Sequence, residues 1–164
     1  MLFHLALFVA LAGAGLHIFR LSSRGTAKVG EVILLWVLVG YCGVPMMGFV
    51  GYGILYPDEL ARITGFPPDS PFQTFTTWAL LGMALASTLS LRFRGTYLIG
   101  PAIAWAVFFV GATAIHLSQS GHAGAGHAGA LTHSNMLMIL ATHGLISVIL
   151  LVSLGMSGVW RAQR

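Results

Sequence analysis

Charge is scarce in this sequence. Asp, Glu, Lys and Arg together make up 7% of its 164 residues, whereas 57% are hydrophobic. A soluble domain carries roughly a quarter charged residues, so a surface of this composition does not suit water. The few basic residues stand singly at the ends of apolar runs, which argues against nucleic acid as a partner. The composition therefore indicates a single integral membrane domain with the lipid bilayer as its solvent.

Catalytic motifs are also missing. The lone cysteine, Cys42, excludes an intrachain disulfide and a Cys-x-x-Cys pair. The sequence contains no phosphate-binding glycine loop, no serine nucleophile motif and no haem-attachment sequence. Three of the four acidic residues lie in one connecting segment, residues 58–69, which argues against a pair of catalytic carboxylates. The sequence names no reaction, and it favours a protein without catalytic activity of its own.

Five long apolar runs are present instead. A helix needs about 20 apolar residues to cross a hydrocarbon core of about 30 Å. We therefore predict an all-α fold, a bundle of five transmembrane helices in one domain, residues 1–164. The first run follows no basic region, so we expect a membrane span there rather than a cleaved signal peptide. The predicted spans cover about residues 2–20, 29–56, 72–91, 96–117 and 134–159.

Two prolines and their neighbours predict local features. Pro45 lies inside the second run and predicts a kink between Tyr41 and Pro45. Pro57 is followed by two acidic residues, which suit the first turn of a helix. Apolar residues then recur at spacings of three, so residues 57–73 are expected to form a short interfacial helix and a capped turn, with Asp69 or Ser70 as the cap.

The charges also predict the threading of the chain. With five spans, one side of the membrane receives Arg20, Arg24, Lys28, Arg92, Arg94, Arg161 and Arg164. The other side receives one basic residue, Arg62, together with Asp58, Glu59 and Asp69. Short cytoplasmic loops are enriched in Lys and Arg. We therefore expect an inner-membrane protein with its N-terminus outside the cytoplasm and its C-terminus inside, with Trp160 as an interfacial anchor.

The histidines are the candidate site residues. A five-residue unit, Gly-His-Ala-Gly-Ala, occurs twice in residues 121–130, between the last two predicted spans. This repeat is typical of a flexible linker, but neutral imidazoles in a tract also suit a metal ion such as Cu, Zn or Ni. Both interpretations stay open. The candidate metal ligands are His116, His122, His127, His133 and His143.

His143 differs from the others because it lies inside a predicted span. An ionisable group at that depth is a functional-site hypothesis by default. We expect its ring to face the bundle interior, where Ser147 one turn later can satisfy the imidazole. The remaining candidates are possible helper ligands at outer or middle depth, namely His4, Cys42, Met46 and Met47. Their positions are explained either by packing or by a soft copper site.

Three motifs carry a resemblance to a known family. They are the segment 57–66 followed by Ser70-Pro-Phe-Gln73, the glycine-to-histidine helix end Phe109-Val-Gly-Ala-Thr-Ala-Ile-His116, and Asn135 with Thr-His at residues 142–143. Together they resemble a family of small bacterial integral membrane proteins of unknown function. The resemblance implies a membrane helix bundle and brings no established activity.

Two functional hypotheses follow. Gly40, Gly43, Gly48 and Gly51 fall on roughly one side of the second span, where small residues let another helix approach closely. This pattern favours an accessory or stabilising subunit bound to other membrane subunits or to a second copy of itself. The alternative is a membrane protein that binds copper or haem through its histidines.

Overall fold

The chain folds into helices throughout the part that the computed structural model describes, which is residues 2–64, 70–120 and 140–160. The elements are α1 (Leu2–Phe19), α2 (Thr26–Val37), the π-helical turn η1 (Leu38–Gly43), α3 (Val44–Leu55), α4 (Pro57–Thr64), α5 (Pro71–Leu89), the 3₁₀ turn η2 (Gly95–Leu98), α6 (Ile99–Ser120), the π-helical turn η3 (Leu140–Gly144) and α8 (Leu145–Ser157). The described residues contain no strand, which confirms the predicted all-α class.

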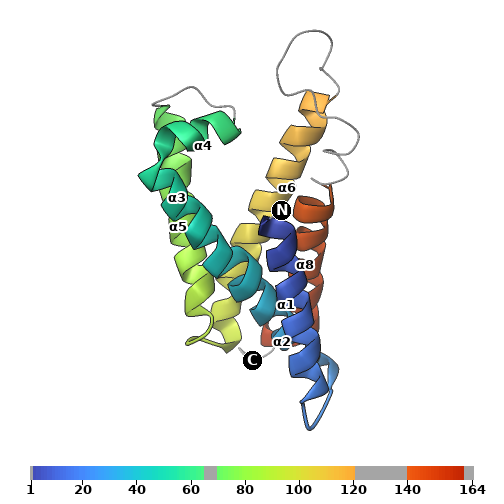
Figure 1. Cartoon of the computed structure of the whole chain (residues 1–164). Helices are drawn as coiled ribbons and strands as arrows, with labels where there is room; N and C mark the ends of the chain where they lie inside the picture. Colours follow the sequence, from blue (N-terminus) through green and yellow to red (C-terminus); the bar gives the residue numbers. More distant parts are fainter. Residues whose placement is uncertain (1, 65–69, 121–139, 161–164) are drawn as a thin grey trace.

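Successive long elements run up and down the bundle (Figure 1). The continuous helix α2–η1–α3 joins its two halves. Its first part, α2, packs against α1 and α8, whereas its second part, α3, packs against α5 and carries α4 over its end. α6 contacts both halves, through α8 and α5. The chain end after α8 and the two turns that follow α1 and α5 lie at the end of the bundle opposite α4.

The irregular turn between α2 and α3 has a local cause. In a regular helix the ring of Pro45 would clash with the carbonyl of Tyr41, four residues earlier. The π-helical turn η1 spans this position, and Pro45 stands in the first turn of α3. A widened turn is therefore observed beside the predicted kink between Tyr41 and Pro45, while the change of helix direction itself stays a prediction.

Glycine lets particular helices approach closely. A Cβ added to Gly30 would lie 2.6 Å from both the Met156 Cβ and the Ser157 nitrogen of α8, so only glycine fits this crossing. Gly43 meets the Thr88 Oγ1 of α5 in the same way, at 2.7 Å. The glycine stripe predicted on the second span is thus divided, because Gly48 and Gly51 face open space.

Apolar side chains cover much of the outer surface as well as the core. Many large apolar side chains are exposed on α1, α5, α6 and α8, while several hydroxyl groups are buried among apolar residues. The indole nitrogen of Trp105, for example, donates to the Ser87 Oγ at 2.7 Å inside the bundle. By length and composition, two helices of the described chain can cross a membrane, Thr26–Leu55 and Gly95–Ile115. The apolar helices Phe3–Phe19 and Thr142–Ser157 are shorter.

Several element boundaries differ from the predicted spans. The second helix begins at Thr26 rather than at residue 29, and α6 continues to Ser120 rather than ending at residue 117. α4 is the helical part of the predicted interfacial segment, and residues 65–69 lie outside the described residues. Ser70 stands before Pro71 at the start of α5, but its side chain makes no capping hydrogen bond. Residues 134–139 of the last predicted span are likewise not described.

Candidate functional site: two π-helical turns in contact

The two π-helical turns meet in the middle of the molecule. The Tyr41 hydroxyl in η1 donates to the main-chain oxygen of Thr142 in η3, at 3.5 Å. Phe109 of α6 contacts both turns, with its ring centre 6.0 Å from that of Tyr41 and 5.4 Å from that of His143. We call these four residues, Tyr41, Phe109, Thr142 and His143, the π-turn cluster. Single π turns inside helices are rare and often occur at functional sites.

Hydroxyl groups satisfy the backbone of η3. The Ser147 Oγ donates to the carbonyl oxygen of His143 at 2.9 Å and contacts that of Ala106 at 3.4 Å. A mid-helix serine commonly bonds to the carbonyl four residues earlier in this way. The sequence offered Ser147 as a hydrogen-bond partner of the His143 imidazole. The described hydrogen bonds of the Ser147 hydroxyl go to main-chain oxygens instead.

The ring of His143 is held by a different residue. Its Nδ1 lies 3.0 Å from the Thr142 Oγ1, and its plane stands edge-on to the Phe109 ring at 76°. The side chain is half-buried, whereas Tyr41, Phe109 and Thr142 are buried. The ring therefore packs against Phe109 of α6, and its expected orientation toward the bundle interior rather than lipid stays a prediction. An imidazole placed in this way can act as a hydrogen-bond partner or as a metal ligand.

The other histidines are less closely placed. His17 accepts a hydrogen bond from the Trp36 Nε1 at 3.2 Å, which joins α1 to α2. His4 is exposed near the start of α1. The structure gives no support for His4 at the level of His116, whose side chain is not described. His122, His127 and His133 also lie outside the described residues.

The sulfur-containing candidates occupy the core. Cys42 and Met46 are buried beside η1, and the Met47 sulfur accepts from the Thr88 Oγ1 at 3.9 Å. Each therefore has a packing role. Among the residues that the structure describes, no group of three or more His, Cys, Asp or Glu side chains is placed to hold a metal ion.

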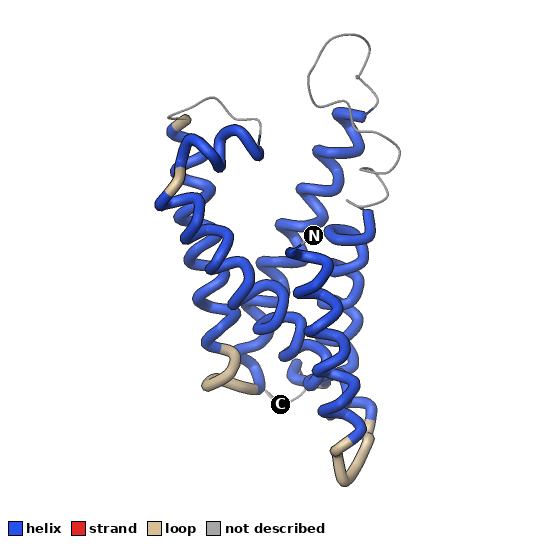
Figure 2. The backbone as a smooth tube through the Cα atoms, in the orientation of Figure 1, coloured by secondary structure: helices blue, strands red, loops and turns tan. Residues whose placement is uncertain are grey.

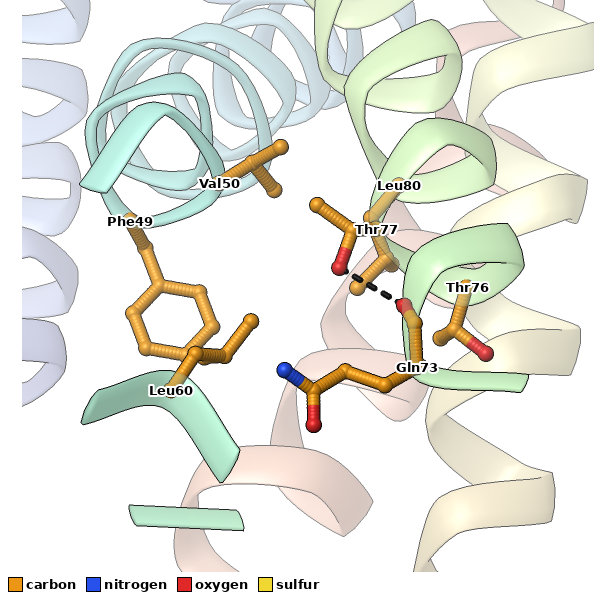
Figure 3. Close-up of a pocket in the computed structure, with 7 residues that line it drawn as sticks. All are labelled: Phe49, Val50, Leu60, Gln73, Thr76, Thr77 and Leu80. Atoms are coloured by element: carbon orange, nitrogen blue, oxygen red, sulfur yellow. Dashed lines mark hydrogen bonds between the residues drawn. The ribbon is translucent and has the colours of Figure 1, made fainter. Parts of the chain in front are cut away.

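A small apolar cavity lies elsewhere, under α4 (Figure 3). Its volume is about 50 Å³, and its walls come from α3, α4 and α5, namely Phe49, Val50, Leu60, Gln73, Thr76, Thr77 and Leu80. The Gln73 Nε2 donates to the Pro57 oxygen at 3.1 Å and so ties the start of α4 to α5. The Gln73 Oε1 is buried without a partner. Sequence patterns did not reveal this cavity, since it depends on how α4 folds back.

α4 also carries the ion pair of the described chain. Both the Nε and the second guanidinium nitrogen of Arg62 donate to the Glu59 carboxylate, the former at 2.9 Å. This hydrogen bonding lowers the pKa of Glu59 and raises that of Arg62. Both groups are exposed, so the pair acts locally on α4.

The described chain is a helical protein with two apolar helices long enough to cross a membrane. It also carries a half-buried imidazole, that of His143, where η3 packs against α6. The model of the DUF6790 family, a family of unknown function, matches residues 1–163, and the chain belongs to this family. No curated protein and no solved structure matches the chain. The family match agrees with the resemblance in its coarse form, a family without known activity.

Proposed function

We propose that this protein is a five-span integral membrane protein that serves as an accessory, non-catalytic subunit of a larger membrane assembly. The observation that carries the membrane assignment is the apolar surface that its helices expose. α8 is the clearest case. Leu145, Val148 and Leu151 are exposed on one side, while the buried hydroxyls of Ser147 and Ser153 donate to main-chain oxygens. Exposed aliphatic side chains are unfavourable in water and favourable in lipid, where polar groups need a partner within the protein.

Exposed aromatic residues at the two ends of the bundle support the same proposal. Tyr52, Tyr56 and Phe72 lie next to α4, and Phe19, Phe93 and Trp160 lie toward the opposite end. Aromatic side chains of this kind favour the boundary between hydrocarbon and headgroups. Exposed aliphatic residues of α6 and α8 occupy the intervening length. The proposed spans remain residues 2–20, 29–56, 72–91, 96–117 and 134–159.

The distribution of charge supports the proposed orientation. The turns that carry Arg24 and Arg92 are at the same end of the bundle, opposite the acidic first turn of α4 (Figure 1). The positive-inside rule then assigns that end to the cytoplasm and α4 to the outer face of a bacterial inner membrane.

The proposed accessory role rests on the exposed glycine face of α3. Gly48 is exposed, and neither Gly48 nor Gly51 has any atom within 4 Å of the position that a Cβ would take. Helices in lipid associate through small residues because the backbones can then approach closely. α3 therefore offers a contact face to a helix of another subunit or of a second copy.

Site-specific photo-crosslinking tests this role. A benzophenone amino acid at Gly48 is expected to give one discrete protein adduct in membranes, whereas the same group at Val148, on the exposed side of α8, is expected to give lipid adducts only. An adduct with the chain itself would identify a homo-oligomer. Protein adducts absent at Gly48, together with a lone monomer that has measurable turnover after mild-detergent purification, would contradict the proposal.

A second candidate function is favoured by the π-turn cluster. Its imidazole is positioned by Thr142 and Phe109 at a rare helix irregularity, which is a suitable arrangement for a copper or haem ligand. Metal analysis and an absorption spectrum of the purified protein distinguish this candidate from the first. A metal or haem present at a stoichiometric ratio would favour it.

A further inference from the structure

The charged side chains of the described residues divide between the two ends of the bundle. Figure 2 shows two turns, drawn in tan, at the end opposite α4. One follows α1 and the other follows α5. They and their flanks hold five exposed cations, which we call the basic end: Arg20, Arg24, Lys28, Arg92 and Arg94. The carboxylate nearest to them in the chain is Glu31, half-buried on α2.

No carboxylate of the described residues forms an ion pair with these cations. The ion pair found among the described residues is Arg62–Glu59, on α4 at the other end. In the basic end, the guanidinium of Arg24 donates to the Phe19 carbonyl at 3.0 Å and lies over the Phe19 ring, 5.5 Å from its centre. No carboxylate of the described chain lies within 4 Å of any of the five. Their charge is therefore available to an external anion.

The turn after α5 carries two exposed arginines that flank an aromatic residue, Phe93, in the sequence. Phe93 is about half exposed, and its ring centre lies 5.3 Å from that of Tyr97. The Tyr97 hydroxyl donates to the Ala86 oxygen at 2.9 Å and so fixes that pair against α5. An exposed phenyl ring favours the interfacial layer of a bilayer. Arg92 and Arg94, one residue before and after it, then lie at the level of the lipid phosphates.

We propose that the basic end binds the headgroups of anionic phospholipids, with Arg92 and Arg94 as the principal contacts. The inference rests on the proposed membrane embedding. A guanidinium group presents paired N–H donors that match a phosphate, and it remains charged at any physiological pH. Anionic leaflets also attract basic residues that lie near the membrane surface. An acidic protein partner would use the same charges, but it would not require Phe93 at the interface.

Lipid titration followed by native mass spectrometry tests the proposal. The full-length protein in detergent is titrated with phosphatidylglycerol and with phosphatidylcholine of identical acyl chains. The wild type is expected to bind phosphatidylglycerol more tightly, and high salt should reduce that preference because it screens exposed charge. Arg92→Gln and Arg94→Gln are each expected to reduce the preference about fivefold. This factor corresponds to the attraction of about 1 kcal/mol between one basic residue and an anionic membrane surface.

Arg62→Gln is the matched control, because it removes one arginine at the opposite end. It is expected to leave the preference unchanged. Equal binding of the two lipids by the wild type, or an equal effect of Arg62→Gln, would overturn the proposal. A benzophenone amino acid at Phe93 adds a second measurement in native membranes, where a lipid adduct supports the proposal and an adduct with an acidic protein overturns it.

Failure of the inference can be distinguished from failure of the proposed function. Alkaline carbonate releases peripheral proteins and leaves embedded ones in the membrane pellet. A protein that stays in the pellet but shows no lipid preference contradicts only the inference. A protein that is released contradicts the membrane assignment on which both rest.

Discussion

The Tyr41 hydroxyl and the main-chain oxygen of Thr142, 3.5 Å apart, join two helices that are distant in the sequence at the one place where each departs from α-helical geometry. A π-helical turn interrupts the regular pattern of main-chain hydrogen bonds. A carbonyl oxygen that loses its regular partner in this way needs another partner within the protein wherever water is excluded. The two irregular turns therefore stabilise each other across the bundle.

Tyr41→Phe tests this contact. The substitution keeps the ring against Phe109 but removes the donor to the Thr142 oxygen, so we expect the free energy of unfolding to fall by about 0.5–1.5 kcal/mol. Tyr52→Phe is the control, because the Tyr52 side chain is exposed on α3. Thermal unfolding in one detergent gives the comparison. Equal melting temperatures for the wild type and Tyr41→Phe would show that the hydroxyl contributes nothing.

Gly30→Ala tests the crossing of α2 and α8. The new methyl group would lie 2.6 Å from atoms of Met156 and Ser157, so the helices must separate, and we expect a loss of about 1–3 kcal/mol. Gly155→Ala is the matched control on α8, where nothing lies within 4 Å of the added Cβ. There we expect a gain of up to about 1 kcal/mol from helix propensity. Similar stabilities for the two variants would refute a tight crossing.

Some of these features could be predicted from sequence and others could not. Pro45 indicated an irregular turn at η1, because a proline conflicts with the carbonyl four residues before it wherever it occurs in a helix. η3 contains no proline. Its main chain contacts Tyr41, which is 101 residues away in the chain, and apolar periodicity contains no information about such a partner.

The glycines show the same limit. The stripe on the second span was predicted from spacing alone, yet Gly30, outside that stripe, lies directly against the backbone of α8, and Gly48 meets nothing within 4 Å. Spacing indicates which face of a helix a glycine occupies. It does not indicate which helix lies opposite, since that depends on the whole arrangement.

The Glu59–Arg62 pair predicts a local response to acid. The hydrogen bond from Arg62 lowers the pKa of Glu59 in the folded protein, so the stabilisation that it gives is present above the ordinary glutamate pKa of about 4.3. It is lost as the pH falls through the lower, folded value. The protection of the α4 amides, measured against the intrinsic exchange rate at each pH, should therefore fall in that acid range.

Glu59→Gln provides the control for this response, because its side chain does not titrate. Its exchange in α4 should be faster than in the wild type at neutral pH and should show no further acceleration in acid beyond the intrinsic rate. An unchanged pH profile in Glu59→Gln would assign the response to another group.

Substitutions of His143 test the role of the π-turn cluster. If the imidazole is structural, His143→Asn should keep most of the stability, because an amide can also form a hydrogen bond with the Thr142 hydroxyl. His143→Leu cannot form that bond and should lose about 0.5–1.5 kcal/mol, the range for one hydrogen bond. Thermal unfolding of the two variants beside the wild type measures the difference. A leucine variant as stable as the wild type would exclude a structural hydrogen bond at this position.

If His143 ligates copper or haem, the same two variants should behave alike. Both remove the imidazole, so bound metal or haem should disappear from both, whatever their stability. His122→Ala and His127→Ala should retain more of it, because those residues belong to a repeated segment in which one imidazole can replace the other. The metal content of the four variants therefore separates a ligand from a packing residue. Loss of metal in the two alanine variants alone would move the site from the π-turn cluster to the repeated segment.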